Sequence, residues 1–240
     1  MGRLDTIIVH PDRASAATAL AERVAGELAQ ALAQALDRGA RACLAVPGGN
    51  TPRDFLRALA AYALDWARVV VLPGDDRWVG EADPRSNGAL LRDALAGTPA
   101  AAATRLALVT DAPTPEAGAE AVAERLAAAL GYPPRLDVAV LGVGEDGHTA
   151  SLFPGGDHLA AALAPDGPGI VSPMRAPGAA EPRITLTLPV LAGAGALHVL
   201  AFGEAKRAAL ARAAERPAAA APIRAVAEAA ARPPSVYWAP

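Results

Sequence analysis

Short apolar runs alternate with longer amphipathic segments along the whole chain. The apolar runs predict strands over Thr6–His10, Ala42–Val46, Val69–Leu72, Leu136–Leu141, Ile184–Leu188, Leu197–Phe202 and Val236–Trp238. The amphipathic segments predict helices over Ala14–Asp37 (ending near Gly39), Pro52–Tyr62, Asn87–Leu95, Pro115–Leu130 and Glu204–Glu215. This alternation predicts an α/β fold with a mostly parallel, Rossmann-like open sheet and helices on both faces.

No stretch of the 240 residues has the character of an interdomain linker. We therefore predict one α/β domain over residues 1–240, with a small subdomain over residues 154–183 as the alternative. Apolar residues make up 52% of the chain, but alanine inflates this share and aromatic residues account for only 4%. The composition indicates helices that pack closely through small side chains. The alanine-rich tract Pro217–Ala221 is interpreted as a turn.

Charge and hydropathy exclude several classes of partner. A net charge of −3 argues against general binding to nucleic acid or to a membrane surface. The apolar stretch Leu188–Phe202 is too short and interrupted to span a bilayer. Met1–Pro11 lacks the pattern of a signal peptide, and lone Cys43 is predicted to be a reduced core residue. We expect a cytoplasmic protein with no obligatory protein partner.

A glycine-rich segment follows the strand Ala42–Val46. Gly48, Gly49 and Asn50 precede Thr51, a favourable helix N-cap, and Pro52, a favourable first helical residue. Free backbone N–H groups and the helix dipole would make this an anion site suited to phosphate. The segment lacks the lysine of a nucleotide-binding P-loop. A purely structural turn fits the same residues equally well.

Two further segments, a loop and the first turn of a predicted helix, carry charged groups. Asp75, Asp76 and Arg77 follow the strand Val69–Leu72 and could bond sugar hydroxyls and phosphate, or form a solvated turn. Lys206 falls in the first turn of a predicted helix, where the helix dipole disfavours a cation. Lys206 could therefore bind an anion, although a role as an ordinary exposed lysine on a helix is an equal alternative.

The segment after Leu136–Leu141 carries Glu145, Asp146 and His148 among glycines. A histidine near an aspartate at the end of a buried strand suits proton transfer at neutral pH, although a lone loop histidine is more often structural. Gly142, Gly144 and Gly147 match the dinucleotide pattern G-x-G-x-x-G, but Asp146 would face the pyrophosphate. We therefore reject a dinucleotide site. No histidine has partners at metal-ligand spacing, so no metal is predicted.

Together these segments resemble the 6-phosphogluconolactonase family, which is related to the glucosamine-6-phosphate deaminases. The resemblance rests on PGGNTP, on WARVVVLPGDDRWVGEADPRSN, on LGVGEDGHTASLFPG, and on PRITLTLPVL followed by FGEAKRAAL. Four motifs in one order, spread over nearly the whole chain, are far more specific than any single one.

The chain departs from the family pattern at several positions. Asn50 stands where serine is usual, Asp76 where glutamate is usual, and Gly80 where proline is common. Residues 176–182 replace a lysine–proline run, so Arg175 or Arg183 would have to substitute for its phosphate contact. The chain also lacks an acidic residue often found near the final tryptophan.

The resemblance implies hydrolysis of 6-phospho-D-glucono-1,5-lactone to 6-phosphogluconate without a cofactor. It implies His148 as general base and Asp146 as the residue that orients it. It implies that Gly48, Gly49, Asn50, Thr51, Arg77 and Lys206 hold the phosphate and that Asp75 bonds sugar hydroxyls.

Two other functions stay open at this point. An amino-sugar phosphate deaminase of the related family would carry a glutamate soon after the histidine, and residues 151–155 offer none. A sugar-phosphate-sensing domain would usually be joined to a DNA-binding helix-turn-helix, for which the first strand at Thr6 leaves no room.

Overall fold

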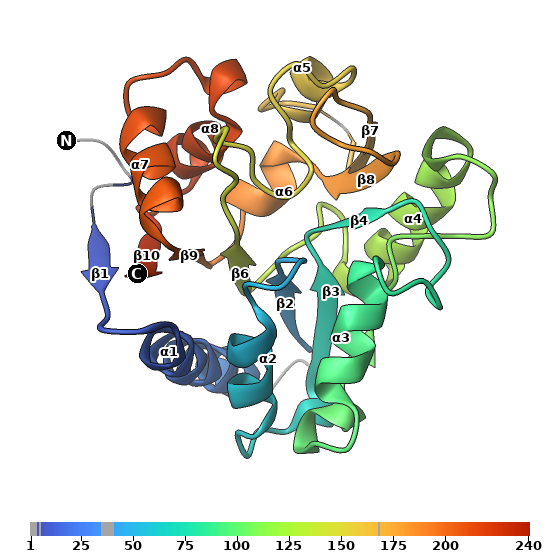
Figure 1. Ribbon diagram of the computed structural model, residues 1–240. Coiled ribbons are helices and arrows are strands. Elements are labelled where there is room, and N and C mark those ends of the chain that lie inside the picture. The colour runs from blue at the N-terminus through green and yellow to red at the C-terminus, as the bar shows by residue number, and fades with distance from the viewer. Residues whose placement is uncertain (1–3, 5, 35–40, 168) are drawn as a thin grey trace.

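The computed structural model describes residues 4, 6–34, 41–167 and 169–240. Its main sheet has seven strands in the order β1-β10-β9-β6-β2-β3-β5, and every neighbouring pair is parallel (Figure 1). The strands are β1 (Ile7–Val9), β2 (Ala42–Val46), β3 (Val69–Pro73), β5 (Thr104–Arg105), β6 (Val138–Leu141), β9 (Ala196–Phe202) and β10 (Ser235–Ala239). The predicted parallel open sheet is confirmed.

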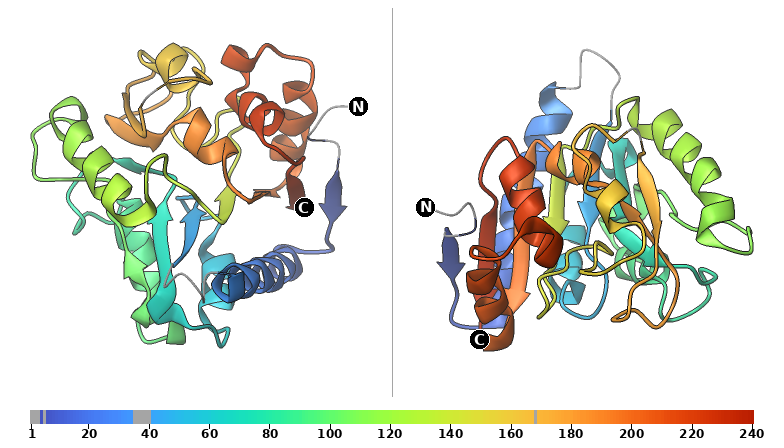
Figure 2. Two further views of the ribbon diagram at one scale, coloured as in Figure 1. Left: turned by 180° about the vertical axis from the view of Figure 1, so that it is seen from behind. Right: turned by 90° about the horizontal axis from the view of Figure 1, so that it is seen from above.

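Helices cover both faces of this sheet, as predicted (Figures 1 and 2). One face carries α1 (Arg13–Gln34), α2 (Arg53–Ala60) and α3 (Asn87–Leu95). The other carries α4 (Pro115–Leu130), α6 (Leu188–Ala192), α7 (Glu204–Ala213) and α8 (Pro222–Ala229). Successive residues of β2 point to opposite faces, so Leu44 packs under α1 and Ala45 packs with the α4 cluster. Burial on both faces explains why this strand reads as a continuous apolar run.

A second, three-stranded antiparallel sheet lies beside the first. It has the order β4-β8-β7, formed by β4 (Asp75–Arg77), β8 (Arg183–Leu186) and β7 (Val171–Met174). Asp75 pairs with Thr185, and Arg77 pairs with Arg183. The prediction of a loop at residues 75–77 is wrong, because these residues pair with a strand distant in the sequence.

Several other element predictions need correction. The strand predicted over Ile184–Leu188 belongs to the small sheet and ends at Leu186, because helix α6 begins at Leu188 with Thr187 as its N-cap. Helix α1 is described up to Gln34, and its predicted end at Asp37–Gly39 lies outside the described residues. The tract Pro217–Ala221 contains a 3₁₀ helix, η4 (Ala218–Ala220), and leads into α8, which was not predicted. Short elements α5 (Leu159–Ala162), η2 (Trp66–Arg68) and η3 (Pro99–Ala102) were also missed.

Cys43 and His198 are both buried in the core, but they differ in their polar surroundings. Cys43 is a buried free cysteine, as predicted, and burial raises the pKa of its thiol to about 12. His198 is buried, and its Nε2 lies 2.7 Å from Glu27 Oε2, whereas its Nδ1 has no hydrogen-bond partner among the described residues. No helix within the described ranges is both long and apolar enough to cross a bilayer.

Candidate active site

The loop after β2 brings the glycine-rich segment to the carboxyl edge of the main sheet. Gly49 has a φ of +82°, in the left-handed region that favours glycine. Helix α2 begins at Arg53, with Pro52 as N-cap and no side-chain hydrogen bond at the cap. The prediction that Thr51 caps this helix is therefore wrong. Thr51 Oγ1 instead accepts a hydrogen bond from Lys206 Nζ at 3.2 Å, which joins the loop to α7.

Gly48 lies directly against the side chain of Asn87. A Cβ atom added at Gly48 would come within 2.0 Å of Asn87 Oδ1. Asn87 is held in place, because its Nδ2 donates to the Asp75 backbone oxygen at 2.7 Å and its Oδ1 accepts from Arg77 Nη1 at 2.8 Å. Asn87 can therefore occupy its position only because residue 48 has no side chain.

We expect Gly48→Ala to lower the free energy of unfolding by about 1–3 kcal/mol, because it overpacks a filled site. Urea denaturation of wild type and variant measures this change. Gly26→Ala is the matched control, since no atom lies within 4 Å of a Cβ added at that position. A Gly48→Ala protein as stable as the wild type would contradict the packing argument.

The two adjacent acids of β4 face different surroundings. Asp75 is 6% exposed, and its Oδ2 accepts a hydrogen bond from Ser151 Oγ at 2.5 Å. Asp76 instead accepts from the backbone N–H groups of Asn87 at 2.7 Å and Gly88 at 2.9 Å, at the start of α3. Burial raises the pKa of Asp76, and these hydrogen bonds oppose the rise. Asp75 is therefore available to a ligand, whereas Asp76 has a structural role.

Two arginines project from paired positions on β4 and β8. Arg77 Nη1 donates to the Arg85 backbone oxygen at 3.0 Å as well as to Asn87. Arg183 lies with its guanidinium carbon 5.7 Å from the centre of the Phe153 ring and its Nη1 3.9 Å from Asp75 Oδ2. Burial lowers the pKa of Arg183, because removing the cation from water disfavours the charged form.

The loop after β6 positions His148. Its Nδ1 lies 2.6 Å from Asp146 Oδ1, and its backbone N–H donates to the same oxygen at 3.1 Å. An ionised carboxylate can only accept, so the Nδ1 contact requires the proton on Nδ1 and leaves Nε2 basic. Gly144 leaves room for this arrangement, since a Cβ there would come within 2.1 Å of Nδ1. The His148 ring also packs against Phe153, with ring centres 4.5 Å apart.

Lys206 enters from the first turn of α7. Besides the hydrogen bond to Thr51, its ammonium group is partly removed from water, and this burial lowers its pKa. Nearby Glu145 opposes the lowering and nearby Arg13 adds to it. A buried cation at a helix N-terminus is favoured when an anion is bound beside it.

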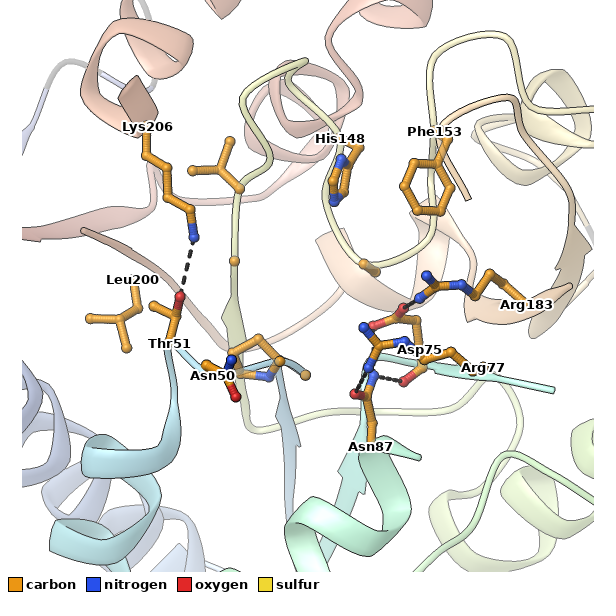
Figure 3. Close-up of a pocket in the computed structure, with 17 residues that line it drawn as sticks. Asn50, Thr51, Asp75, Arg77, Asn87, His148, Phe153, Arg183, Leu200 and Lys206 are labelled. Carbon is orange, nitrogen blue, oxygen red and sulfur yellow. Dashed lines mark hydrogen bonds and ion pairs between the residues drawn. The ribbon is translucent and has the colours of Figure 1, made fainter. Parts of the chain in front are cut away.

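These segments enclose one pocket with a cavity volume of about 350 Å³, which is in the range of small-molecule sites (Figure 3). Its lining residues come from seven segments and are Pro47, Gly48, Gly49, Asn50, Thr51, Asp75, Arg77, Asn87, Gly142, Val143, His148, Ala150, Phe153, Gly178, Arg183, Leu200 and Lys206. Figure 3 shows Lys206 and Thr51 on one side, Arg183 and Asp75 on the other, and His148 between them at the rim.

Nearly all of the predicted site residues meet at this pocket. Asp146 is the exception, because it does not line the cavity and contacts His148 from behind. Of the two arginines considered as replacements for the missing lysine, Arg183 lines the pocket, whereas Arg175 pairs with Glu116 away from it. No group of three or more His, Cys, Asp or Glu side chains in the described part of the chain is placed to hold a metal ion.

Sequence reasoning missed two residues that shape the pocket. Asn87 links Gly48, Asp75 and Arg77, and its only signal was its place at the end of the acidic block. Phe153 contacts both His148 and Arg183. Phe153 belongs to the motif LGVGEDGHTASLFPG, but the sequence does not indicate that its ring faces a pocket.

Comparison with known proteins identifies the family. A model of the family described as glucosamine-6-phosphate isomerases/6-phosphogluconolactonase matches residues 15–238. A 6-phosphogluconolactonase of Rhizobium meliloti (strain 1021) is 46% identical over 224 residues, 93% of this chain and 95% of the relative. One from Mesorhizobium japonicum is 45% identical over 230 residues, 96% of this chain and 93% of the relative.

A solved structure agrees with these sequences. The crystal structure of a 6-phosphogluconolactonase from Shewanella baltica OS155 matches with a TM-score of 0.89 and 32% sequence identity, over 98% of this chain and 97% of that chain. Similarity of this extent shows that the chain belongs to the family of glucosamine-6-phosphate isomerases and 6-phosphogluconolactonases.

Proposed function

We propose that this protein hydrolyses 6-phospho-D-glucono-1,5-lactone to 6-phospho-D-gluconate, as a cytoplasmic enzyme of the oxidative pentose phosphate pathway. One observation carries the proposal: His148, bonded to Asp146, faces the same pocket as Thr51 and Lys206. A base and a set of anion-binding groups thus face one cavity of suitable size. The names of the similar proteins support this choice of substrate.

His148 is the general base of the proposed reaction. Its Nε2 takes a proton from a water molecule, and the water oxygen attacks the lactone carbonyl carbon. A tetrahedral oxyanion forms, the bond between this carbon and the ring oxygen breaks, and the proton passes from His148 to the ring oxygen. Asp146 fixes the ring orientation and stabilises the charged imidazolium in the intermediate state.

The remaining polar groups position the substrate. Gly48, Gly49, Asn50 and Thr51, together with Arg77 and Lys206, hold the phosphate through backbone N–H groups and positive charge. Asp75, which lines the pocket, accepts hydrogen bonds from sugar hydroxyls. Such anchoring places the carbonyl carbon beside the activated water.

The proposal needs neither a metal nor a cofactor. The lactone hydrolyses readily in water, and general base catalysis contributes about 10²–10⁴-fold. Positioning by the phosphate site adds to this factor, so a modest set of groups suffices for a reactive ester.

The family also contains isomerases that act on glucosamine 6-phosphate, so the experiment must separate the two reactions. Purified protein is mixed with freshly generated phosphogluconolactone and, separately, with glucosamine 6-phosphate. We expect acid release above the spontaneous rate in the first mixture and no ammonia in the second. Ammonia release without enzymatic acid release would refute the lactonase proposal.

A further inference from the structure

Arg183 differs from Arg77 and Lys206, the other cations of the pocket, because its N–H groups have no hydrogen-bond acceptor among the described residues. Its side chain is only 12% exposed, and it lines the cavity. Within the described residues, no acceptor lies within hydrogen-bond distance of its guanidinium, and its buried Nε has no partner. The nearest carboxylate oxygens, on Asp75 and Glu181, are 3.9 Å away. Buried donors in proteins are nearly always satisfied, so this arginine lacks an acceptor that a ligand could supply.

The neighbouring cations already have acceptors. Arg77 donates to Asn87 and to a backbone oxygen, and Lys206 donates to Thr51. Burial lowers the pKa of Arg183, and the positive charge of nearby Arg77 adds to this lowering, whereas Asp75 and Glu181 oppose it. Among the three cations that line the pocket, Arg183 is thus the one whose side chain has no hydrogen-bond partner within the described residues.

Arg183 lies on the side of the pocket near Phe153 and His148, not on the side of Thr51 and Lys206. Its guanidinium lies over the Phe153 ring, and the same ring packs against His148. Figure 3 shows Arg183 on the side of Phe153, whereas Lys206 lies on the opposite side with Thr51. The water activated by His148 must attack a carbonyl carbon close to the His148 ring, so the carbonyl oxygen lies at this end of the cavity.

The carboxylate beside Arg183 argues against phosphate at its guanidinium, whereas the neighbouring Arg77 donates to Asn87, which lies against Gly48 of the glycine-rich loop. Asp75 is the one carboxylate among the residues that line the pocket, and it adjoins the guanidinium. A dianionic phosphate beside a buried carboxylate would be repelled. A carbonyl oxygen that gains a single negative charge only during the reaction is accommodated at lower cost.

We propose that Arg183 is a catalytic residue whose unsatisfied N–H groups bind the C1 oxygen of the lactone and stabilise the oxyanion. This inference rests on the proposed lactonase function. As water adds to C1, the carbonyl π electrons move to the C1 oxygen beside Arg183, and the water proton moves to His148 Nε2. When the bond between C1 and the ring oxygen breaks, the C1 oxygen becomes part of the product carboxyl group and the ring oxygen receives the proton from His148. The carboxyl group then loses the remaining proton of the water to solvent and becomes a carboxylate.

The test compares two phosphorylated ligands that differ at C1. The product, 6-phosphogluconate, is an open chain with a carboxylate there, whereas 1,5-anhydroglucitol 6-phosphate keeps the ring and has no exocyclic oxygen at C1. We expect Arg183→Gln to weaken binding of phosphogluconate about tenfold or more, the value of a hydrogen bond to a charged group, and to leave the anhydro compound almost unaffected. Calorimetric titration measures both affinities. Lys206→Met should weaken both ligands, because both carry the phosphate.

Kinetics supply a second readout. Removal of one oxyanion donor lowers kcat by about 10²–10³-fold, so Arg183→Gln should lose kcat with little change in KM. Arg175→Gln is the control, since Arg175 pairs with Glu116 outside the pocket. If Arg183→Gln does not fold, as judged by circular dichroism, the same ligand pair is measured with Arg183→Lys. That variant keeps the charge but loses the planar fork, and it should show the same selective loss.

Two outcomes would overturn the inference. Equal losses for both ligands would make Arg183 a phosphate contact, and unchanged affinity for both would make it a purely structural residue. A wild-type protein that binds neither ligand and releases no acid from the lactone would instead refute the proposed function.

Discussion

His148→Ala is expected to lower the turnover of phosphogluconolactone by about 10²–10⁴-fold, the usual contribution of a positioned general base. Binding of 6-phosphogluconate should be nearly unchanged, because the phosphate and hydroxyl contacts come from other segments of the pocket. The measurement is acid release at constant pH, with the spontaneous hydrolysis of the lactone subtracted from each trace.

The control for this variant is His158→Ala, which removes an exposed histidine at the start of α5. Its turnover should equal that of the wild type. A His148→Ala protein with wild-type turnover would show that another group, or the substrate itself, activates the water. The role given to Asp146 would then be lost as well, since Asp146 acts only through the ring.

Lys206→Met should mainly weaken the affinity for phosphorylated ligands, by about 10–100-fold, which corresponds to the loss of one charge-assisted hydrogen bond to phosphate. Methionine keeps most of the volume and removes the charge, so the surrounding packing is preserved. The expected kinetic signature is a raised KM for the lactone. Arg57→Met serves as the matched control, because Arg57 is exposed on α2 and does not line the pocket.

The pKa of Lys206 gives this prediction a dependence on pH. Burial lowers that pKa from the ordinary lysine value of 10.5. The ammonium that binds phosphate is present below the pKa, so the affinity for 6-phosphogluconate should fall as the pH rises through it. The fall should begin at a lower pH than for an ordinary lysine and should be absent in Lys206→Met. An identical pH profile in both proteins would remove Lys206 from the phosphate site.

The sequence predicted the main sheet well because its strands are buried on both faces. Ala42–Val46 and Val69–Leu72 are uninterrupted apolar runs, and the structure places them side by side as β2 and β3. Helices that begin at a favourable N-cap residue were predicted equally well. Helix α3 begins at Asn87 as predicted, with Ser86 Oγ accepting from the Ala89 backbone N–H at 3.1 Å.

The small antiparallel sheet was not predicted because it depends on pairing between distant segments. Asp75–Arg77 is polar and only three residues long, so no local periodicity marks it as a strand. Its pairing with Arg183–Leu186 is visible only once the chain has folded. Helix α8 was missed for a different reason, since it spans only eight residues and directly follows the alanine-rich tract that was interpreted as a turn.

The pocket itself was predicted in outline from strand ends. Loops that follow parallel strands meet at one edge of a sheet, and this explains why Gly48, His148 and Lys206, which the resemblance assigned to one site, line the same pocket. The order of strands and loops does not predict which way each side chain points. Asp75 and Asp76 are chemically identical neighbours, and only the tertiary structure shows that Ser151 binds one and the start of α3 binds the other.

Lys206 is the only lysine among the 240 residues, since every other basic side chain is an arginine or a histidine. Reagents that modify primary amines therefore have a single side-chain target, and the lowered pKa of this amine increases its reactive neutral fraction. A phosphate-bearing aldehyde such as pyridoxal 5′-phosphate, fixed by borohydride reduction, would attach a chromophore inside the cavity. Apart from the terminal α-amine, no other position of the chain would compete for the label, so its yield would report directly how much of the cavity a ligand occupies.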